Sequence, residues 1–80
     1  MEECKVTLKR EDYALGEAYE VFYDGKLTSY EVVWDNRWCK YAIYRSHRPL
    51  LCKPNLWAVK RFIETDIILR EGERWTRKGI

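Results

Sequence analysis

Apolar and polar residues alternate through most of residues 19–45, and this alternation predicts a run of β-strands. Two turn signals divide the run, Asp24-Gly25 and Asn36. An Asp-Gly pair between alternating segments is a strong hairpin signal, because both loop residues of a type I′ turn need a positive φ. The segment is therefore predicted to form three antiparallel strands in succession.

The first of these turns also predicts how the first two strands pair. It places Tyr23 opposite Lys26 and Glu20 opposite Ser29. A loop shifted by one residue would instead place Glu20 opposite Glu31, and like charges that face each other destabilise a strand pair. We therefore expect Glu20 and Glu31 not to face each other.

A second loop at Asn36-Arg37 would place Trp34 opposite Cys39. Side chains alternate across a sheet with a period of two, so each turn defines which residues share a face. The two turns agree on one face, and this agreement between independently placed loops supports a single buried surface. Its members are Tyr19, Val21, Tyr23, Tyr30, Val32, Trp34, Cys39, Tyr41 and Ile43.

The segments on either side of these strands are shorter. Residues 4–9 alternate and predict a strand with Val6 and Leu8 inward, which pairs either with the strand that begins near Tyr19 or with the opposite edge of the sheet. Residues 46–49 read as a turn or loop, because proline disfavours helical geometry in the residue before it. Residues 50–52 read as a short apolar plug at one end of the core.

A helix is predicted after Pro54, from Leu56 to about Thr65, with Asn55 as its N-cap. Its apolar residues fall on one side at 100° per residue, whereas Trp57, Arg61 and Glu64 fall on the opposite side. The residues on the apolar side are Leu56, Val59, Phe62, Ile63 and Ile67. The tail, residues 66–80, reads either as a small hairpin about Glu71-Gly72 or as one more strand of the sheet.

Together these patterns predict a single α+β domain over residues 1–80. It has a four-stranded, mainly antiparallel sheet made of the meander 19–45 and the strand 4–9. One helix, at about residues 55–65, packs on one face, and a short strand or hairpin follows. The order of elements over residues 55–79 is similar to the wing end of a winged-helix domain, although strands replace the two helices that precede a wing in that family.

Candidate chemistry is sparse. The series Cys39, His47 and Cys52 matches no common zinc spacing, and no glycine-rich phosphate loop is present. We therefore expect no metal site, no cofactor and no enzymatic activity. Cys39 and Cys52 could form a disulfide, although free thiols are expected in a reducing cytosol. With no apolar run near the ~20 residues of a bilayer span and no signal peptide, a cytoplasmic protein without membrane contact is expected.

The net charge of +2 hides a strong asymmetry. Residues 1–36 hold four Lys and Arg against nine Asp and Glu, whereas residues 37–80 hold eleven against four. Such asymmetry points to a polyanionic partner. Alternatively, the two halves neutralise each other within the fold or between two copies.

The first functional hypothesis is nucleic-acid binding by the basic C-terminal half. Cations bind phosphates regardless of sequence, and aromatic side chains stack on unpaired bases. The predicted binding residues are Trp57, Lys60, Arg61, Arg70, Arg74, Trp75, Arg77 and Lys78.

The alternative hypothesis is protein interaction, with a partner or with a second copy of the chain. The sheet face opposite the buried one is not cleanly polar, and an exposed apolar patch usually marks an interface. The predicted interface residues are Phe22, Leu27, Val33, Trp38 and Tyr44.

Overall fold

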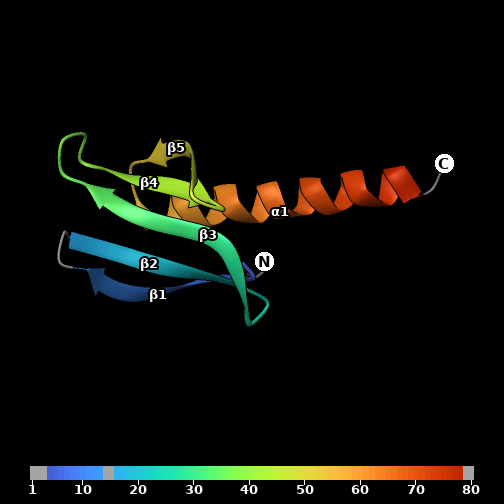
Figure 1. Cartoon of the computed structure of the whole chain (residues 1–80), viewed down its shortest axis with the longest axis horizontal. Coiled ribbons are helices and arrows are strands. Elements are labelled where there is room, and N and C mark those ends of the chain that lie inside the picture. Colours follow the sequence, from blue (N-terminus) through green and yellow to red (C-terminus); the bar gives the residue numbers. More distant parts are fainter. Residues whose placement is uncertain (1–3, 14–15, 79–80) are drawn as a thin grey trace.

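The computed structural model of the chain describes residues 4–13 and 16–78, with side-chain surroundings for 4–11 and 16–70. The described residues form one antiparallel sheet in the order β1-β2-β3-β4-β5, followed by a helix (Figure 1). The predicted α+β class is thus confirmed, with five strands in place of four. The elements are β1 (Val6–Tyr13), β2 (Gly16–Tyr23), β3 (Lys26–Asp35), β4 (Lys40–Arg45), β5 (Arg48–Lys53) and α1 (Leu56–Lys78).

The additional strand is β5, in a segment that the sequence predicts as a loop and a plug. A two-residue turn joins it to β4, with Ser46 at φ 50° and His47 at φ 66°. Without glycine or asparagine, this Ser-His turn carries no strong hairpin signal in the sequence. Pro49 is compatible with β5 because β5 lies at the edge of the sheet, where a missing N–H is tolerated.

β1 occupies the first of the two positions left open by the sequence, beside β2. Val6 is opposite Tyr23 and Leu8 is opposite Val21. Val6 is fully buried and Leu8 packs against the core, so the predicted inward side of this strand is confirmed.

The pairing of β2 with β3 follows the prediction only near the turn. Tyr23 is opposite Lys26, as predicted, and Asp24 and Gly25 both have positive φ. A β-bulge then shifts the register, so that Glu20 faces Glu31. The prediction that these two carboxylates would not face each other is wrong.

The bulge explains why the unfavourable pair is tolerated. The Thr28 hydroxyl donates to the carbonyl of Val21 at 2.8 Å and accepts from the Tyr30 N–H at 3.2 Å, which provides partners for the irregular backbone. The shift amounts to two residues, so the alternation survives and both Val21 and Tyr30 remain buried. Burial of two large side chains outweighs repulsion between carboxylates at the surface.

The β3–β4 loop is longer than predicted. Asp35 is opposite Lys40, so residues 36–39 form a four-residue loop, and Trp34 faces Tyr41 rather than Cys39. The shift is again two residues, and Trp34 and Tyr41 still share a face. Cys39, however, lies in the loop with φ 51° and is exposed, so its predicted burial is wrong.

α1 begins where the sequence predicts, because the Asn55 side-chain oxygen accepts a hydrogen bond from the Ala58 N–H at 2.9 Å. It continues to Lys78 rather than ending near residue 65. The predicted C-terminal strand or hairpin is therefore wrong, and so is the similarity to a wing. Ile63 and Ile67 both pack against the core, and the helical i, i+4 spacing between them outweighs the strand-like run at residues 67–69.

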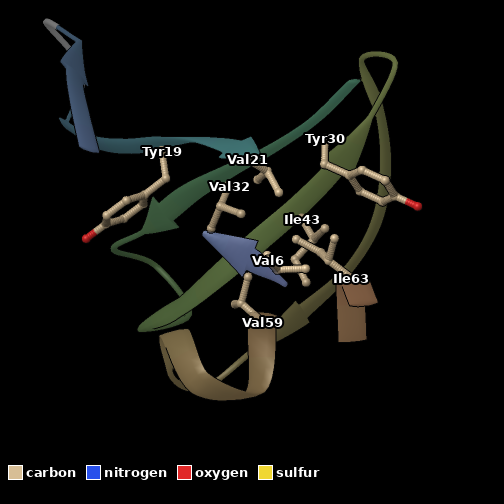
Figure 2. Close-up of a cluster of buried hydrophobic side chains, with 8 residues drawn as sticks. All are labelled: Val6, Tyr19, Val21, Tyr30, Val32, Ile43, Val59 and Ile63. Carbon is tan, nitrogen blue, oxygen red and sulfur yellow. The ribbon is translucent and has the colours of Figure 1, made fainter. Parts of the chain in front are cut away.

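The core lies between the sheet and the first half of α1 (Figure 2). Val59 and Ile63 of α1 are fully buried beside the inward side chains of the strands. α1 contacts both edge strands, β1 and β5, as well as β4. Its second half projects beyond the sheet (Figure 1). The buried cluster consists of Val6, Tyr19, Val21, Tyr30, Val32, Ile43, Val59 and Ile63.

An aromatic group on the inward-facing side of the sheet surrounds Tyr41. The Trp34 and Tyr41 rings meet edge to face at 4.8 Å, and the Tyr19 and Tyr41 rings at 6.2 Å. Both tyrosine hydroxyls donate to Glu17. Burial, followed by the Glu17 hydrogen bond and charge, raises the pKa of Tyr19 to about 12. These contacts confirm that Tyr19, Trp34 and Tyr41 share one face.

Candidate nucleic-acid interface on the helix

All eight residues of the predicted nucleic-acid site belong to the backbone of α1. The side chains of Arg74, Trp75, Arg77 and Lys78 lie outside the described residues. Among the other four, Trp57, Arg61 and Arg70 are exposed, and Lys60 is partly buried. The structure therefore places the predicted residues along one rod rather than on a hairpin.

Trp57 and Arg61 form a pair on the solvent side of α1. Trp57 is 70% exposed, and the guanidinium carbon of Arg61, one turn later, lies 5.2 Å from the centre of its ring. This is a cation–π contact, and at an exposed site it contributes about 0.5–1 kcal/mol. The contact joins a cation to a large apolar surface that remains in solvent.

The two acidic residues of α1 whose side chains the structure describes, Glu64 and Asp66, are bound by residues in or next to the sheet. Glu64 accepts a hydrogen bond from the Lys5 N–H at the start of β1, at 3.0 Å. Asp66 accepts from Arg45 of β4 at 3.0 Å and from the Tyr30 hydroxyl of β3. The first turn contains no acidic residue. Both carboxylates thus help to attach α1 to the sheet.

Asp66 also binds Arg70, whose Nε donates to the same oxygen at 3.1 Å. Partial burial raises the pKa of Asp66, but the hydrogen bonds from Tyr30 and Arg70 and the charges of Arg70 and Arg45 outweigh it, so the pKa lies below its ordinary value. Arg70 is therefore engaged in an ion pair. Of the predicted cations with described side chains, Lys60, Arg61 and Arg70, it is the one that the structure pairs with a carboxylate.

The other two cations with described side chains have no such partner. Within residues 4–11 and 16–70, no ion pair joins Lys60 or Arg61 to a carboxylate. A further cation, Lys53, lies two residues before Asn55, where its ammonium group is 5.8 Å from the centre of the Phe62 ring. The start of α1 therefore combines Lys60 and Arg61 with one exposed indole, and no described acidic side chain pairs with either cation, whereas Lys53 lies over the ring of Phe62.

The predicted interface residues are less closely grouped. Phe22 and Leu27 are cross-strand neighbours near the β2–β3 turn. Trp38, 68% exposed, lies in the β3–β4 loop, and β3 separates it from Leu27 by about 25 Å. Val33 and Tyr44 are partly buried. The structure thus divides the predicted patch between the two ends of the sheet.

The sheet surface between these two ends, on the side opposite α1, is acidic; we call this side the outer face. A hydrogen bond with Glu11, then desolvation and the charge of Glu11, raise the pKa of Glu20. Glu31 lies 3.5 Å from Nδ1 of His47. These two residues and Glu20 help to line an open pocket of about 560 Å³ beside the bulge. Sequence analysis misses this cluster, because the bulge that creates it has no turn residue to reveal it.

Comparison of the chain with known protein families, with characterised proteins and with solved structures finds no match. In the part of the chain that the structure describes, no helix is long and apolar enough to cross a membrane. The same residues contain no group of three or more His, Cys, Asp and Glu side chains that could hold a metal ion.

Proposed function

We propose that this protein binds nucleic acid through the outward side of α1. The observation that carries the proposal is the separation of charge on this helix. Glu64 and Asp66 are bound to the sheet, whereas Lys60 and Arg61 remain without carboxylate partners among the described residues. A cationic helix side attracts phosphates without any requirement for base sequence.

The shape of α1 favours the same role. A helix of 23 residues is about 35 Å long, and its second half projects from the sheet (Figure 1). In the sequence the projecting half carries three more of the predicted cations, Arg74, Arg77 and Lys78, together with two acidic residues, Glu71 and Glu73. A rod of this kind can contact phosphates along its length, while the acidic outer face of the sheet points elsewhere.

The proposal is tested by charge reversal at Arg61, Arg74 and Arg77 together. We expect the wild type to bind DNA or RNA with an affinity that falls as salt is raised from about 50 to about 200 mM. The triple Arg→Glu variant should bind at least roughly tenfold more weakly at low salt, because three phosphate contacts become repulsive. Fluorescence anisotropy with labelled oligonucleotides measures both effects.

The matched control reverses three cations that lie outside α1, Lys26, Arg37 and Arg48, all of them exposed. This variant has the same net charge as the first, so its affinity separates a local site from a general charge effect. Undiminished binding by the α1 variant, or no binding by the wild type at low salt, would reject the proposal.

A second candidate function is protein interaction through the outer face of the sheet. The observation that supports it is the exposure of Leu27 and Trp38, at 61% and 68%. Large apolar side chains in solvent often mark contact sites for a partner or a second copy.

A further inference from the structure

We infer that α1 recognises single-stranded nucleic acid, and that Trp57 is the position on which an unpaired base stacks. This inference rests on the proposed function and names the class of nucleic acid that the helix binds. The evidence is the surroundings of Trp57 and the chemistry of its ring.

The indole of Trp57 has room for a stacked base. Arg61 lies over the ring at 5.2 Å, yet 70% of the Trp57 surface remains in solvent. No other cation–π or aromatic contact to Trp57 is found among the described residues. The Trp57 ring thus contacts the Arg61 guanidinium, and most of its surface remains accessible to a ligand.

The position of Trp57 on the helix excludes a role in the core. Val59 and Ile63 of the same helix are fully buried, and Leu56 packs against the core beside them. Trp57 lies on the other side of α1. Trp38 is almost equally exposed, but of these two tryptophans only Trp57 has a described cation over its ring, so Trp57 offers an aromatic face and a phosphate-binding charge at one place.

The chemistry of this pair favours an unpaired base over a base pair. In a duplex the base faces are stacked on one another, and only their edges are accessible in the grooves. Indole has one N–H donor and no acceptor, so it reads base edges poorly, whereas its face stacks on any unpaired base. Arg61 and Lys60 lie beside it to neutralise the phosphates of the same strand.

The experiment compares two nucleic acids and three variants. The probes are a labelled oligothymidine of roughly 15 nucleotides and a duplex of equal length. At about 50 mM salt the wild type should bind the single strand at least roughly tenfold more tightly than the duplex. Trp57→Ala should weaken single-strand binding roughly five- to hundredfold and leave duplex binding unchanged.

Two further variants define the cause. Trp57→Phe keeps an aromatic face and should retain most of the single-strand affinity. Trp38→Ala removes a tryptophan of almost equal exposure from the β3–β4 loop and should change nothing. Thermal unfolding confirms that each variant is folded, which is expected because both side chains lie largely in solvent.

The outcomes separate this inference from the proposed function. Equal affinity of the wild type for both probes, or an equal loss for both in Trp57→Ala, overturns the single-strand assignment and leaves nucleic-acid binding by α1 in place. Absence of binding to either probe at low salt overturns both. Loss of single-strand binding in Trp38→Ala would move the stacking site to the β3–β4 loop and also overturn the inference.

Discussion

The outward side of α1 and the outer face of the sheet both expose large apolar side chains, but they differ in where the carboxylates lie. On α1, Glu64 accepts a hydrogen bond from Lys5, next to β1, and Asp66 accepts one from Arg45 of β4. On the sheet, Glu20 and Glu31 face each other in solvent beside an open pocket. The first surface is left cationic and the second anionic.

This difference shows that the net charge of the chain says little about its binding surfaces. Residues 56–78 carry six Lys and Arg against four Asp and Glu, and the rest of the chain carries nine against nine, so the net charge of +2 hides how the charges are placed in space. The sign of each surface depends on which carboxylates the fold uses internally. Nucleic acid is therefore expected to meet α1 and to avoid the outer face.

The largest effect is expected when the internal carboxylate on α1 is removed. Asp66→Ala deprives Tyr30, Arg45 and Arg70 of a shared acceptor, and we expect a loss of about 1–3 kcal/mol in the free energy of unfolding. Urea unfolding followed by circular dichroism measures it. Thr65→Ala, at an exposed neighbouring position, is the control and should change stability little.

The pH dependence of the same variant checks the cause. The pKa of Asp66 in the folded chain lies below its ordinary value of 3.8, so its stabilising contribution is present above that value and is lost as the pH falls through the folded pKa. The difference in stability between wild type and Asp66→Ala should therefore shrink below about pH 4. A difference that stays constant into strong acid would contradict an ionised anchor.

A smaller effect is expected from removing a carboxylate on the outer face. The raised pKa of Glu20 means that its charged form is unfavourable in the fold, so Glu20→Gln should raise the melting temperature slightly at neutral pH. The gain should disappear below the ordinary Glu pKa of 4.5, where Glu20 is protonated in both states. Differential scanning calorimetry measures both.

A double-mutant cycle shows whether Glu11, whose hydrogen bond and charge raise the pKa of Glu20, is the cause. If Glu20 and Glu11 repel each other, Glu11→Gln should give little further gain once Glu20→Gln is present. Fully additive gains, or a lower melting temperature in Glu20→Gln, would show that the pair is not repulsive.

The smallest effect on nucleic-acid affinity is expected from Trp38→Glu. This change adds a charge to the β3–β4 loop, which is part of neither α1 nor the pair of carboxylates Glu20 and Glu31. The affinity should be nearly unchanged. Light scattering of the wild type and the variant tests the alternative function, because an interface through the outer face predicts an assembly that Trp38→Glu abolishes. A large loss of nucleic-acid affinity in this variant would break the distinction between the two surfaces.

The sequence predicts the inward face of this fold better than its strand pairing. Val21, Tyr30 and Val32 were assigned correctly although both registers shifted, because each shift was of two residues and preserved the alternation. Register depends on backbone hydrogen bonds such as those of Thr28, which leave no trace in the apolar pattern. The rule that like charges do not face each other fails at Glu20 and Glu31, because burial of side chains on the inward face stabilises the fold more than the repulsion between the two carboxylates destabilises it.

The candidate site was predicted in part. Glu64, which helical periodicity places outward, is instead partly buried and bound to Lys5. The exposure of Trp57 and Arg61 follows from the same periodicity and is confirmed. Their contact, and the internal use of Glu64 and Asp66, depend on where β1 and β4 lie beneath the helix, which no local pattern specifies. The length of α1 was missed because Glu71-Gly72 resembles a turn, yet it lies within the helix.

The contact of α1 with both β1 and β5 has a consequence for synthesis of the chain. The segment that bridges the two edges follows all five strands in the chain, so the strands are synthesised before the helix that covers them. Until residues 56–67 emerge, the strands present an uncovered apolar face and two open edges, a state that associates readily with other nascent chains. The sheet thus reaches its covered state only after α1 has been synthesised and has packed across it.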